Sequence, residues 1–537
     1  MPVKDKIVYN EKVFVPPPSV PVHKLLFDKL NENLERVADV EWLVNGDTGE
    51  SIKYGEIIPL VNKLSSYLKE KGFQPGDVLM LYCANHRYFF LPIFSAWSCG
   101  GGATSICPGA LPSSAIHLAI HSKTKFIIVD DCTAGKAKEV MQKVDTIVEI
   151  ITLESEVEGC TPLSKIFENG KEDVEGDIDI DVDNTVAYLP YSSGTTGLAK
   201  GIIHTHRSVG AMLQIQLELE IGTDFAIGVH MYYISGFYIC TSSLLTFSRI
   251  IFLKNYEEET FLRMLEKYQP SFLLSLPFPL IMMIKHPNLE DYNLESLKVI
   301  STGGAFMSSE NQRALMKRLP GLQDVRSLYA MTETGGITSF EKGISADIRE
   351  KHRASVGTPY PGNEVKVIDE NGIELGPYEK GEICVRNSSS MKEYLHNPEA
   401  TRNAKIDGGW IKTGDYGYYT EDGFIYCEGR KNELINYKGH YIVPTMLESM
   451  LLQHPAVKDA GVIGIPDKEV GESVGAAIIL QDNANVDVTD ILSYMNSLLS
   501  QNEKPRAGVK VFKTLPYSDA GKLFKNQLLK DWTSDCD

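Results

Sequence analysis

Short apolar runs that alternate with amphipathic segments are the feature that most constrains the fold of this chain. The segment "LVNKLSSYLKEKG" spaces its apolar residues about 3.6 apart and ends at a glycine, and the strand-like run "DVLMLYCAN" follows it. "TKFIIVDD" is a second such run, and "IIFLKNY", "SFLLSLP" and "KVISTGG" continue the pattern between residues 250 and 304. Strands that alternate with helices in this way predict an α/β fold, with a parallel sheet covered by helices on both faces.

The length of the chain and changes in its pattern of apolar and turn residues predict more than one packed unit. A chain of 537 residues exceeds what one hydrophobic core usually supports. Near the start, "EWLVNGDTGESIKY" carries two apolar-alternating arms around turn residues, which predicts a β-hairpin. After about residue 350 the chain changes to short strands and turns, as in a barrel or small β-unit. The final hundred residues return to mixed α and β patterns and are long enough to form a separate domain.

The composition excludes several classes of protein. A formal net charge of −18 argues against nucleic acid as the main partner, because phosphate backbones require basic patches. The nine cysteines show no CxxC pair and no His/Cys spacing of a metal site, which is typical of reduced thiols in the cytosol. The start "MPVKDKIVYNEKVF" lacks a signal-peptide pattern, the end "SDCD" is not an SKL-type address, and no apolar run is long enough to span a bilayer. We therefore expect a cytoplasmic protein without a transmembrane segment.

The stretch "YSSGTTGLAKG", residues 191–201, follows an apolar run and is rich in hydroxyls and glycines. It is not a P-loop of the GxxxxGK[ST] type, because Gly194, Gly197 and Lys200 have a different spacing and no Ser or Thr follows the lysine. Glycines let backbone N–H groups approach a ligand closely, hydroxyls donate further bonds, and the lysine supplies positive charge. From these residues alone, a phosphate cradle and a plain flexible loop both stay open.

Three further stretches have chemistry-bearing residues. Residues 329–334 read "YAMTET", residues 409–435 contain a TGD turn followed by Gly429 and Arg430, and residues 516–528 place a lysine after a glycine. Each one alone is typical of a surface turn. The occurrence of all these stretches in one chain, in this order and at these separations, is much rarer by chance.

Together these motifs resemble those of the adenylate-forming superfamily, which includes acyl-CoA synthetases, beetle luciferases and the adenylation domains of peptide synthetases. The likeness is strongest to the group of 4-coumarate–CoA ligases, acyl-CoA synthetases and beetle luciferases, and it extends from "IKYGEI" through "MKEYLHNPEATRNA" to "DAGKLFK". It implies a large N-terminal domain of two doubly wound α/β subdomains plus a small β-barrel, with a smaller mobile α+β C-terminal domain. The boundaries it implies are 1–428 for the adenylation domain, 429–430 for the hinge and 431–537 for the mobile domain.

The resemblance also implies a set of site residues, with ATP and Mg²⁺ as cofactors and CoA as cosubstrate. Glu333 is similar to the family's Mg²⁺ ligand, Thr332 to the α-phosphate contact, and Lys522 to the lysine that bridges the substrate carboxylate and the α-phosphate. The positions that match nucleotide- and CoA-binding residues are Ser192, Ser193, Gly194, Thr195, Thr196, Gly197 and Lys200 in the phosphate loop, Gly303, Gly304 and Ala305 beside the adenine, Tyr329 stacking on it, Asp415 and Arg430 at the ribose, and Gly439 at the thiol channel. The acyl pocket implied is Ile234, Phe237, Thr241, Gly304, Gly336 and Ile337.

Some positions depart from the family pattern. Ile234 stands where the family usually has a histidine that gates the carboxylate and thiol routes, and His230 lies four residues upstream. Ala199 and Ala330 replace the family's usual proline and glycine. His206 matches a family histidine that we interpret as structural, and for His230 a structural role is also favoured over replacement of the missing histidine.

The resemblance implies an ATP-dependent carboxylate–CoA ligase. Such an enzyme activates a fatty or aryl carboxylic acid as an acyl-AMP with release of pyrophosphate and then transfers the acyl group to CoA. Residues that beetle luciferases use are missing: there is no arginine between Arg207 and Arg249, and Asn436 occupies the position of a lysine. A luciferase-type monooxygenase acting on an adenylated substrate with O₂, and a non-catalytic relative, stay open as alternatives.

Overall fold

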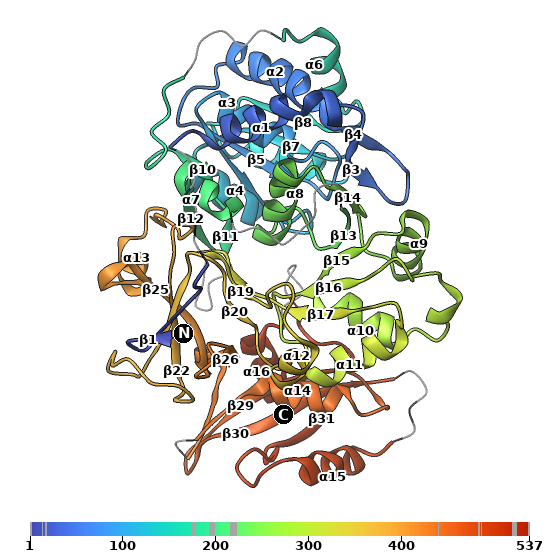
Figure 1. Cartoon of the computed structure of the whole chain (residues 1–537), viewed down its shortest axis with the longest axis vertical. Helices are drawn as coiled ribbons and strands as arrows, with labels where there is room; N and C mark the ends of the chain where they lie inside the picture. Colours follow the sequence, from blue (N-terminus) through green and yellow to red (C-terminus); the bar gives the residue numbers. More distant parts are fainter. Residues whose placement is uncertain are drawn as a thin grey trace.

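The structure is a computed structural model of the chain, and it describes residues 3–12, 14, 16, 19–172, 178–192, 199–214, 223–438, 440–481, 484, 486–517 and 523–534. Two sheets rich in parallel strands are formed mainly by residues 41–327, antiparallel strands follow, and the C-terminal segment forms a smaller unit at one end of the molecule (Figure 1). Among the described residues, no helix combines the length and apolar character needed to cross a membrane.

The first large sheet is named here the β5 sheet. Its central strands are parallel, and β10 joins them to the antiparallel strand β12, which carries Lys200. The strand order is β11-β12-β10-β6-β5-β7-β8-β9, with β23 also paired to β12. The bounds are Val78–Tyr82 (β5), Gly102–Ser105 (β6), Thr124–Val129 (β7), Glu149–Thr152 (β8), Thr161–Pro162 (β9), Val186–Tyr188 (β10), Tyr191–Ser192 (β11), Lys200–Thr205 (β12) and Glu393–Tyr394 (β23).

The second large sheet, the β15 sheet, has the order β17-β16-β15-β13-β14-β3-β4. Its strands are parallel except for β4, which pairs antiparallel with β3. This β3–β4 pair is the hairpin predicted from "EWLVNGDTGESIKY", and that prediction is confirmed. The bounds are Glu41–Asn45 (β3), Ser51–Lys53 (β4), Asp224–Gly228 (β13), Arg249–Phe252 (β14), Phe272–Ser275 (β15), Val299–Thr302 (β16) and Asp324–Ser327 (β17).

Helices bury both faces of the two large sheets. Along β5, Leu79 and Leu81 belong to one hydrophobic cluster, whereas Met80 and Tyr82 belong to another. Alternate side chains of a strand point to opposite faces, so this division shows that the β5 sheet is covered on both sides. The first cluster also contains Phe225 of β13, so it is a core shared by the two sheets. The predicted α/β architecture is confirmed.

Several helices that cover the large sheets begin at signals visible in the sequence. Proline stands in the first turn of α3, α4 and α10, where its missing N–H costs no helical bond. The Ser308 side chain accepts from Asn311 N at the start of α11. The bounds are Val22–Val37 (α1), Tyr54–Glu70 (α2), Leu91–Ser98 (α3), Pro112–Ser122 (α4), Ala134–Met141 (α5), Leu163–Asn169 (α6), His206–Gln214 (α7), Ile234–Thr246 (α8), Glu258–Tyr268 (α9), Pro277–Lys285 (α10), Leu289–Asp291 (η1) and Ser309–Arg318 (α11).

Short antiparallel strands follow, as expected for the region after residue 350. One sheet, the β25 sheet, has the order β1-β2-β21-β22-β25-β24, with β26 also on β25, and a small sheet has the order β18-β19-β20. The bounds are Val3–Lys4 (β1), Ile7–Tyr9 (β2), Tyr329–Met331 (β18), Gly335–Ser339 (β19), Thr358–Pro359 (β20), Glu364–Ile368 (β21), Gly381–Arg386 (β22), Lys405–Ile406 (β24), Trp410–Tyr419 (β25) and Ile425–Arg430 (β26), with helical segments Ala346–Lys351 (α12), Pro398–Ala404 (α13) and Asp407–Gly409 (η2).

The C-terminal segment has its own mixed sheet and hydrophobic core. The strand order is β28-β27-β30-β29, and β31 pairs parallel with β30. A cluster running from Ile435 to Val509 packs inside this unit. The boundaries 428 and 431 stay predictions. The bounds are Lys431–Glu433 (η3), Ile435–Tyr437 (β27), His440–Ile442 (β28), Pro444–Leu452 (α14), Val457–Asp467 (β29), Gly471–Leu480 (β30), Val488–Leu498 (α15), Gly508–Val511 (β31) and Lys525–Ser534 (α16).

Candidate nucleotide-binding site

The predicted adenine turn follows the carboxyl end of β16, the edge where α/β sheets usually bind ligands. Gly303 and Gly304 come directly after this strand, and Gly304 has a φ of +81° that favours glycine. A Cβ on Gly303 would lie 2.6 Å from Leu328 Cδ1 and 2.9 Å from the Leu328 carbonyl oxygen. Gly303 therefore lets the turn approach the segment that leads into Tyr329. Gly304 and Ala305 are exposed, so the turn presents backbone to solvent.

Tyr329, Asp415 and Arg430 form a continuous chain of contacts. The Tyr329 hydroxyl donates to Asp415 Oδ2 at 2.5 Å, and Arg430 Nε lies 3.2 Å from Asp415 Oδ1. Asp415 and Arg430 are direct partners in the β25–β26 ladder, and Arg430 also donates to the Thr413 carbonyl oxygen at 3.0 Å. The structure thus joins three sequence-predicted residues that belong to two different sheets.

Burial and charge shift the pKa values of this group. Burial, followed by the charge of Asp415, raises the pKa of Tyr329, so its hydroxyl stays protonated and donates. Burial alone would lower the pKa of Arg430, but the negative charges of Asp415 and Glu333 contribute to raising it. Arg430 therefore stays positively charged beside Asp415.

Glu333 and Thr332 are each held by a residue that we did not predict. The Tyr394 hydroxyl donates to Glu333 Oε1 at 2.8 Å, and both residues are 9% exposed. His204 Nε2 lies 2.7 Å from the Thr332 carbonyl oxygen. A carbonyl only accepts, so Nε2 carries the hydrogen and Nδ1 is free to accept from Ser208 Oγ at 3.3 Å. Burial lowers the pKa of His204 to about 4, which keeps the ring neutral.

The two ends of the predicted phosphate loop lie side by side. Ser192 in β11 pairs with Lys200 in β12, and Tyr191 pairs with Gly201. Lys200 Nζ lies 5.3 Å from the centroid of the Tyr394 ring, within the range of a cation–π contact. Lys200 is therefore connected through Tyr394 to Glu333. The loop residues Ser193, Gly194, Thr195, Thr196 and Gly197 lie outside the described residues.

The residues predicted for the acyl pocket differ in their accessibility. Phe237, Thr241 and Ile337 are 0% exposed, and the Phe237 ring stacks on Tyr188 at 4.0 Å between centroids. The Thr241 hydroxyl donates to the Phe237 carbonyl oxygen of its own helix at 2.6 Å. Three others, Ile234, Gly304 and Gly336, are at least partly accessible. The assignment of these residues to an acyl pocket stays a prediction.

The remaining predicted residues belong to the hinge and the C-terminal unit. Gly429 lies next to Arg430 at the end of β26, and a Cβ there would lie 3.4 Å from Val443 Cγ1, an ordinary contact. Gly439 and Lys522 lie outside the described residues. The roles of Gly429, Gly439 and Lys522 stay predictions.

The histidines noted in the sequence occupy buried or half-buried positions. His206 Nδ1 accepts from Val22 N at 3.2 Å, and burial lowers its pKa to about 4, which agrees with a structural role. His230 precedes α8 and stacks on Tyr232 at 5.0 Å between ring centroids. The signals that pointed toward the two residues we missed were modest: Tyr394 lies inside "MKEYLHNPEA", and His204 is the first histidine of "HTHRSV".

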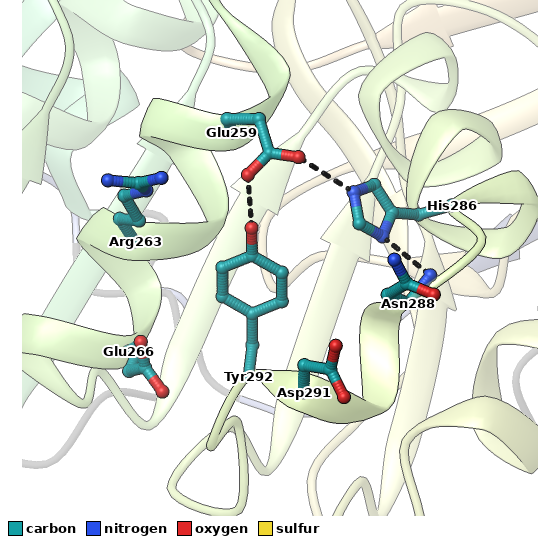
Figure 2. Close-up of a pocket in the computed structure, with 7 residues that line it drawn as sticks. All are labelled: Glu259, Arg263, Glu266, His286, Asn288, Asp291 and Tyr292. Atoms are coloured by element: carbon teal, nitrogen blue, oxygen red, sulfur yellow. Dashed lines mark hydrogen bonds and ion pairs between the residues drawn. The ribbon is translucent and has the colours of Figure 1, made fainter.

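A separate surface pocket lies between α9 and the η1 segment (Figure 2). Glu259 accepts hydrogen bonds there from the Tyr292 hydroxyl and from His286 Nε2 (Figure 2). The other residues that line it are Arg263, Glu266, Asn288 and Asp291. This pocket contains none of the residues predicted for the nucleotide site.

Two family models of AMP-binding enzymes match the chain, in agreement with the family that its motifs resemble. Residues 30–395 match the AMP-binding enzyme family, and residues 446–522 match the AMP-binding enzyme C-terminal domain. The chain belongs to the AMP-binding enzyme family. The resemblance to adenylate-forming enzymes noted in the sequence is thereby confirmed, as is the expectation of an enzyme of the CoA-ligase type.

Relatives within the AMP-binding enzyme family match the chain over nearly its whole length. The chain is 28% identical to 4-coumarate–CoA ligase 2 of Petroselinum crispum, over 98% of this chain and 97% of that protein. It is 30% identical to 4-coumarate–CoA ligase-like 1 of Arabidopsis thaliana, over 96% and 95% of the two chains. These alignments include both the large and the C-terminal units.

Solved structures of AMP-binding enzymes have the same fold. The anthranilate CoA ligase AuaEII, in complex with anthranoyl-AMP, superposes with a TM-score of 0.86 at 20% identity, covering 96% of this chain and 98% of that one. The luciferase-like enzyme from the nonluminescent Zophobas morio mealworm has a TM-score of 0.72 at 25% identity, covering 79% of this chain and 98% of that one. The predicted arrangement of a large N-terminal and a small C-terminal unit agrees with these neighbours.

Proposed function

We propose that this AMP-binding enzyme is an ATP-dependent carboxylate–CoA ligase. It activates a fatty or aryl carboxylic acid as an acyl-AMP with release of pyrophosphate and then transfers the acyl group to CoA. The observation that carries the proposal is the chain of contacts Tyr329–Asp415–Arg430, and Glu333 follows Tyr329 in the same short segment "YAMTE". These are residue types that bind an aromatic base, a ribose and a phosphate-bound cation.

Each of these residues has chemistry suited to one part of ATP. Asp415 is a buried carboxylate that accepts from Tyr329 and pairs with Arg430, and it is suited to accept bonds from ribose hydroxyls. The Tyr329 ring offers a flat surface for the adenine. Lys200 and Arg430 supply positive charge against a formal net charge of −18, so the phosphates are held by local groups and not by the overall field.

The residues present also fit a magnesium ion that binds with the nucleotide. Among the described residues, no cluster of three or more His, Cys, Asp or Glu side chains forms a protein-built metal site. Mg²⁺ commonly binds through one or two carboxylates together with substrate phosphates and water, so a single carboxylate is sufficient. Glu333 offers that carboxylate, since Tyr394 uses Oε1 and no described residue donates to Oε2. When bound, the ion would neutralise negative charge on the phosphates.

The acid is proposed from the relatives and from the predicted pocket. The names of the relatives specify 4-coumarate, and one neighbouring structure is an anthranilate CoA ligase. Ile234, Gly304 and Gly336 are the predicted pocket residues that stay accessible, and an apolar side chain beside two glycines suits an aromatic ring or an apolar tail. Aryl acids therefore come first in the panel, with fatty acids next.

The second half-reaction requires CoA to reach the same acyl-AMP. We propose that residues 431–537 turn about Gly429 and Arg430 between the two steps, so that the Lys522 segment serves adenylation and the Gly439 segment serves thioester formation. Glycine tolerates a large change of backbone dihedrals, and the modest contacts around Gly429 are compatible with this movement.

The test is pyrophosphate release by the full chain with ATP, Mg²⁺ and a panel of 4-coumarate, anthranilate, benzoate and fatty acids of increasing length. We expect at least one acid to stimulate release and an acyl-CoA to form only when CoA is added. Release without any thioester product would contradict a CoA ligase. Light emission with ATP and O₂ in the absence of CoA would instead favour the luciferase-type alternative.

A further inference from the structure

Tyr394 connects the two charged residues on which nucleotide binding is proposed to depend. Its hydroxyl donates to Glu333 Oε1 at 2.8 Å, and its ring lies below the ammonium group of Lys200, with 5.3 Å between Lys200 Nζ and the ring centroid. One side chain thus contacts the predicted metal ligand by its polar end and the predicted phosphate-loop lysine by its face.

The backbone fixes Tyr394 in this position from both sides. Strand β23 pairs antiparallel with β12, so that Tyr394 lies opposite Ile202, and Leu395 N donates to the Gly201 carbonyl oxygen at 2.8 Å. On the other side, Met391 N donates to the Glu333 carbonyl oxygen at 2.7 Å. The segment 391–395 that carries Tyr394 is therefore bonded both to the lysine strand and to the main chain of Glu333.

The protonation state of Tyr394 suits a donor to a carboxylate. An ordinary tyrosine has a pKa of about 10, so the Tyr394 phenol carries a proton at neutral pH and donates it to Glu333 Oε1. A hydrogen bond to one carboxylate oxygen fixes the plane of the carboxylate and leaves the other oxygen to bind a cation. Such outer partners of a metal ligand commonly change metal affinity by about 10–100-fold when they are removed.

We propose that Tyr394 is a positioning residue that orients Glu333 for the nucleotide-bound magnesium ion and supports Lys200 for the phosphates. The inference rests on the proposed function for the identity of the ligand, MgATP. It concerns binding of the metal and the nucleotide, and it does not depend on which acid is activated.

Two substitutions separate the two contacts. Tyr394→Phe removes the hydroxyl and keeps the ring below Lys200, whereas Tyr394→Leu removes both. We expect Tyr394→Phe to lower the affinity for the metal ion about 10–100-fold, because a hydrogen bond to a charged group is lost. The maximal rate should be restored at high Mg²⁺. We expect Tyr394→Leu to weaken ATP affinity further, because the cation–π contact is lost as well.

The primary readout is binding, measured without any carboxylic acid. Mn²⁺ replaces Mg²⁺ as a paramagnetic probe, and electron paramagnetic resonance reports its binding to the full chain in the presence of ATP. We also expect the effect of Tyr394→Phe on Mn²⁺ binding to disappear in a Glu333→Gln background, because the hydroxyl acts through that carboxylate. An effect of equal size in both backgrounds would overturn the proposal.

Tyr292→Phe is the matched control. Tyr292 also donates its hydroxyl to a glutamate, Glu259, but it does so in the separate surface pocket (Figure 2). We expect this variant to bind Mn²⁺ and ATP like the unmodified chain. Wild-type metal and nucleotide binding by Tyr394→Phe would overturn the proposal. Tyr394-dependent binding without any acyl-CoA product would support it while contradicting the proposed ligase, so the two failures are distinguishable.

Discussion

The Tyr329 hydroxyl donates a hydrogen bond of 2.5 Å to Asp415 Oδ2, and the two residues are 86 positions apart in the chain. This bond joins the small sheet of β18, β19 and β20 to the β25 sheet. Arg430 completes the contact from the next strand, so that the carboxylate of Asp415 is satisfied on two sides. The same three residues are those that we propose to bind adenosine.

Removal of this hydroxyl is predicted to affect both stability and nucleotide binding. In Tyr329→Phe, buried Asp415 loses a donor to its charged oxygen, which we expect to lower the free energy of unfolding by about 1.5–3 kcal/mol. The ring remains for stacking, so the KM for ATP should rise by less than in Asp415→Asn. Urea unfolding and pyrophosphate-exchange kinetics measure the two effects. An unchanged unfolding midpoint would contradict the stability prediction.

Asp415→Asn is predicted to weaken nucleotide binding more strongly. The amide keeps the shape of the side chain but loses the charge that pairs with Arg430 and the second acceptor oxygen. We expect the KM for ATP to rise about 10²-fold, because about two charge-assisted hydrogen bonds are lost. Asp422→Asn, in the turn between β25 and β26, is the control and should bind ATP normally. Equal effects of the two substitutions would argue against a ribose-binding role.

Gly303→Ala is predicted to distort the turn after β16. Its Cβ would lie 2.6 Å from Leu328 Cδ1 and 2.9 Å from the Leu328 carbonyl oxygen, so the main chain must shift. We expect a loss of about 1–3 kcal/mol in unfolding free energy, together with weaker ATP binding. Gly135→Ala in α5 meets no atom within 4 Å and should be neutral or slightly stabilising. Thermal unfolding and ATP titration of both variants check this contrast.

Buried His204 predicts a dependence of stability on pH. Burial lowers its folded-state pKa to about 4, whereas an unfolded histidine has a pKa of about 6.5. Protons therefore favour the unfolded chain, and the contribution of His204 is complete above about pH 6.5 and is lost as the pH falls toward about 4. Between pH 7 and pH 5 the loss from this one group is about 2 kcal/mol.

The measurement is urea unfolding of the wild type and of His204→Gln at pH 7 and pH 5. Glutamine does not titrate, and its amide N–H is able to donate to the Thr332 carbonyl oxygen in place of Nε2. We expect a smaller decrease in unfolding free energy for the variant than for the wild type. Identical decreases would show that His204 does not contribute to the pH dependence.

Lys522→Ala is predicted to separate the two half-reactions. The resemblance assigns Lys522 to the α-phosphate and the carboxylate, so its removal should slow adenylation about 10²–10³-fold. Thioester formation from a synthetic acyl-AMP and CoA should continue, because that step no longer needs the charge. Pyrophosphate exchange and acyl-CoA formation are measured on the same preparation. A similar loss in both steps would contradict this role.

The sequence by itself determined the classes of element and the identity of most candidate site residues. The apolar runs at 78–82, 124–129 and 272–275 predict strands, because the pattern of side chains along an element depends on neighbours in the chain. The motif residues were recognisable for a similar reason: "YAMTET" and the TGD turn are short and contiguous. Each motif is therefore visible as a run of consecutive residues in the sequence.

Only the tertiary structure decided which of these residues touch. Tyr394 and Glu333 are 61 positions apart, and His204 and Thr332 are 128 apart, so no periodicity relates them. Their contacts arise because β23 pairs with β12 and because the segment 329–334 packs against that edge of the β5 sheet. Burial also favours the uncharged forms of these groups, because charge is costly where water is excluded. It raises the pKa of the Tyr394 phenol and lowers the pKa of the His204 ring.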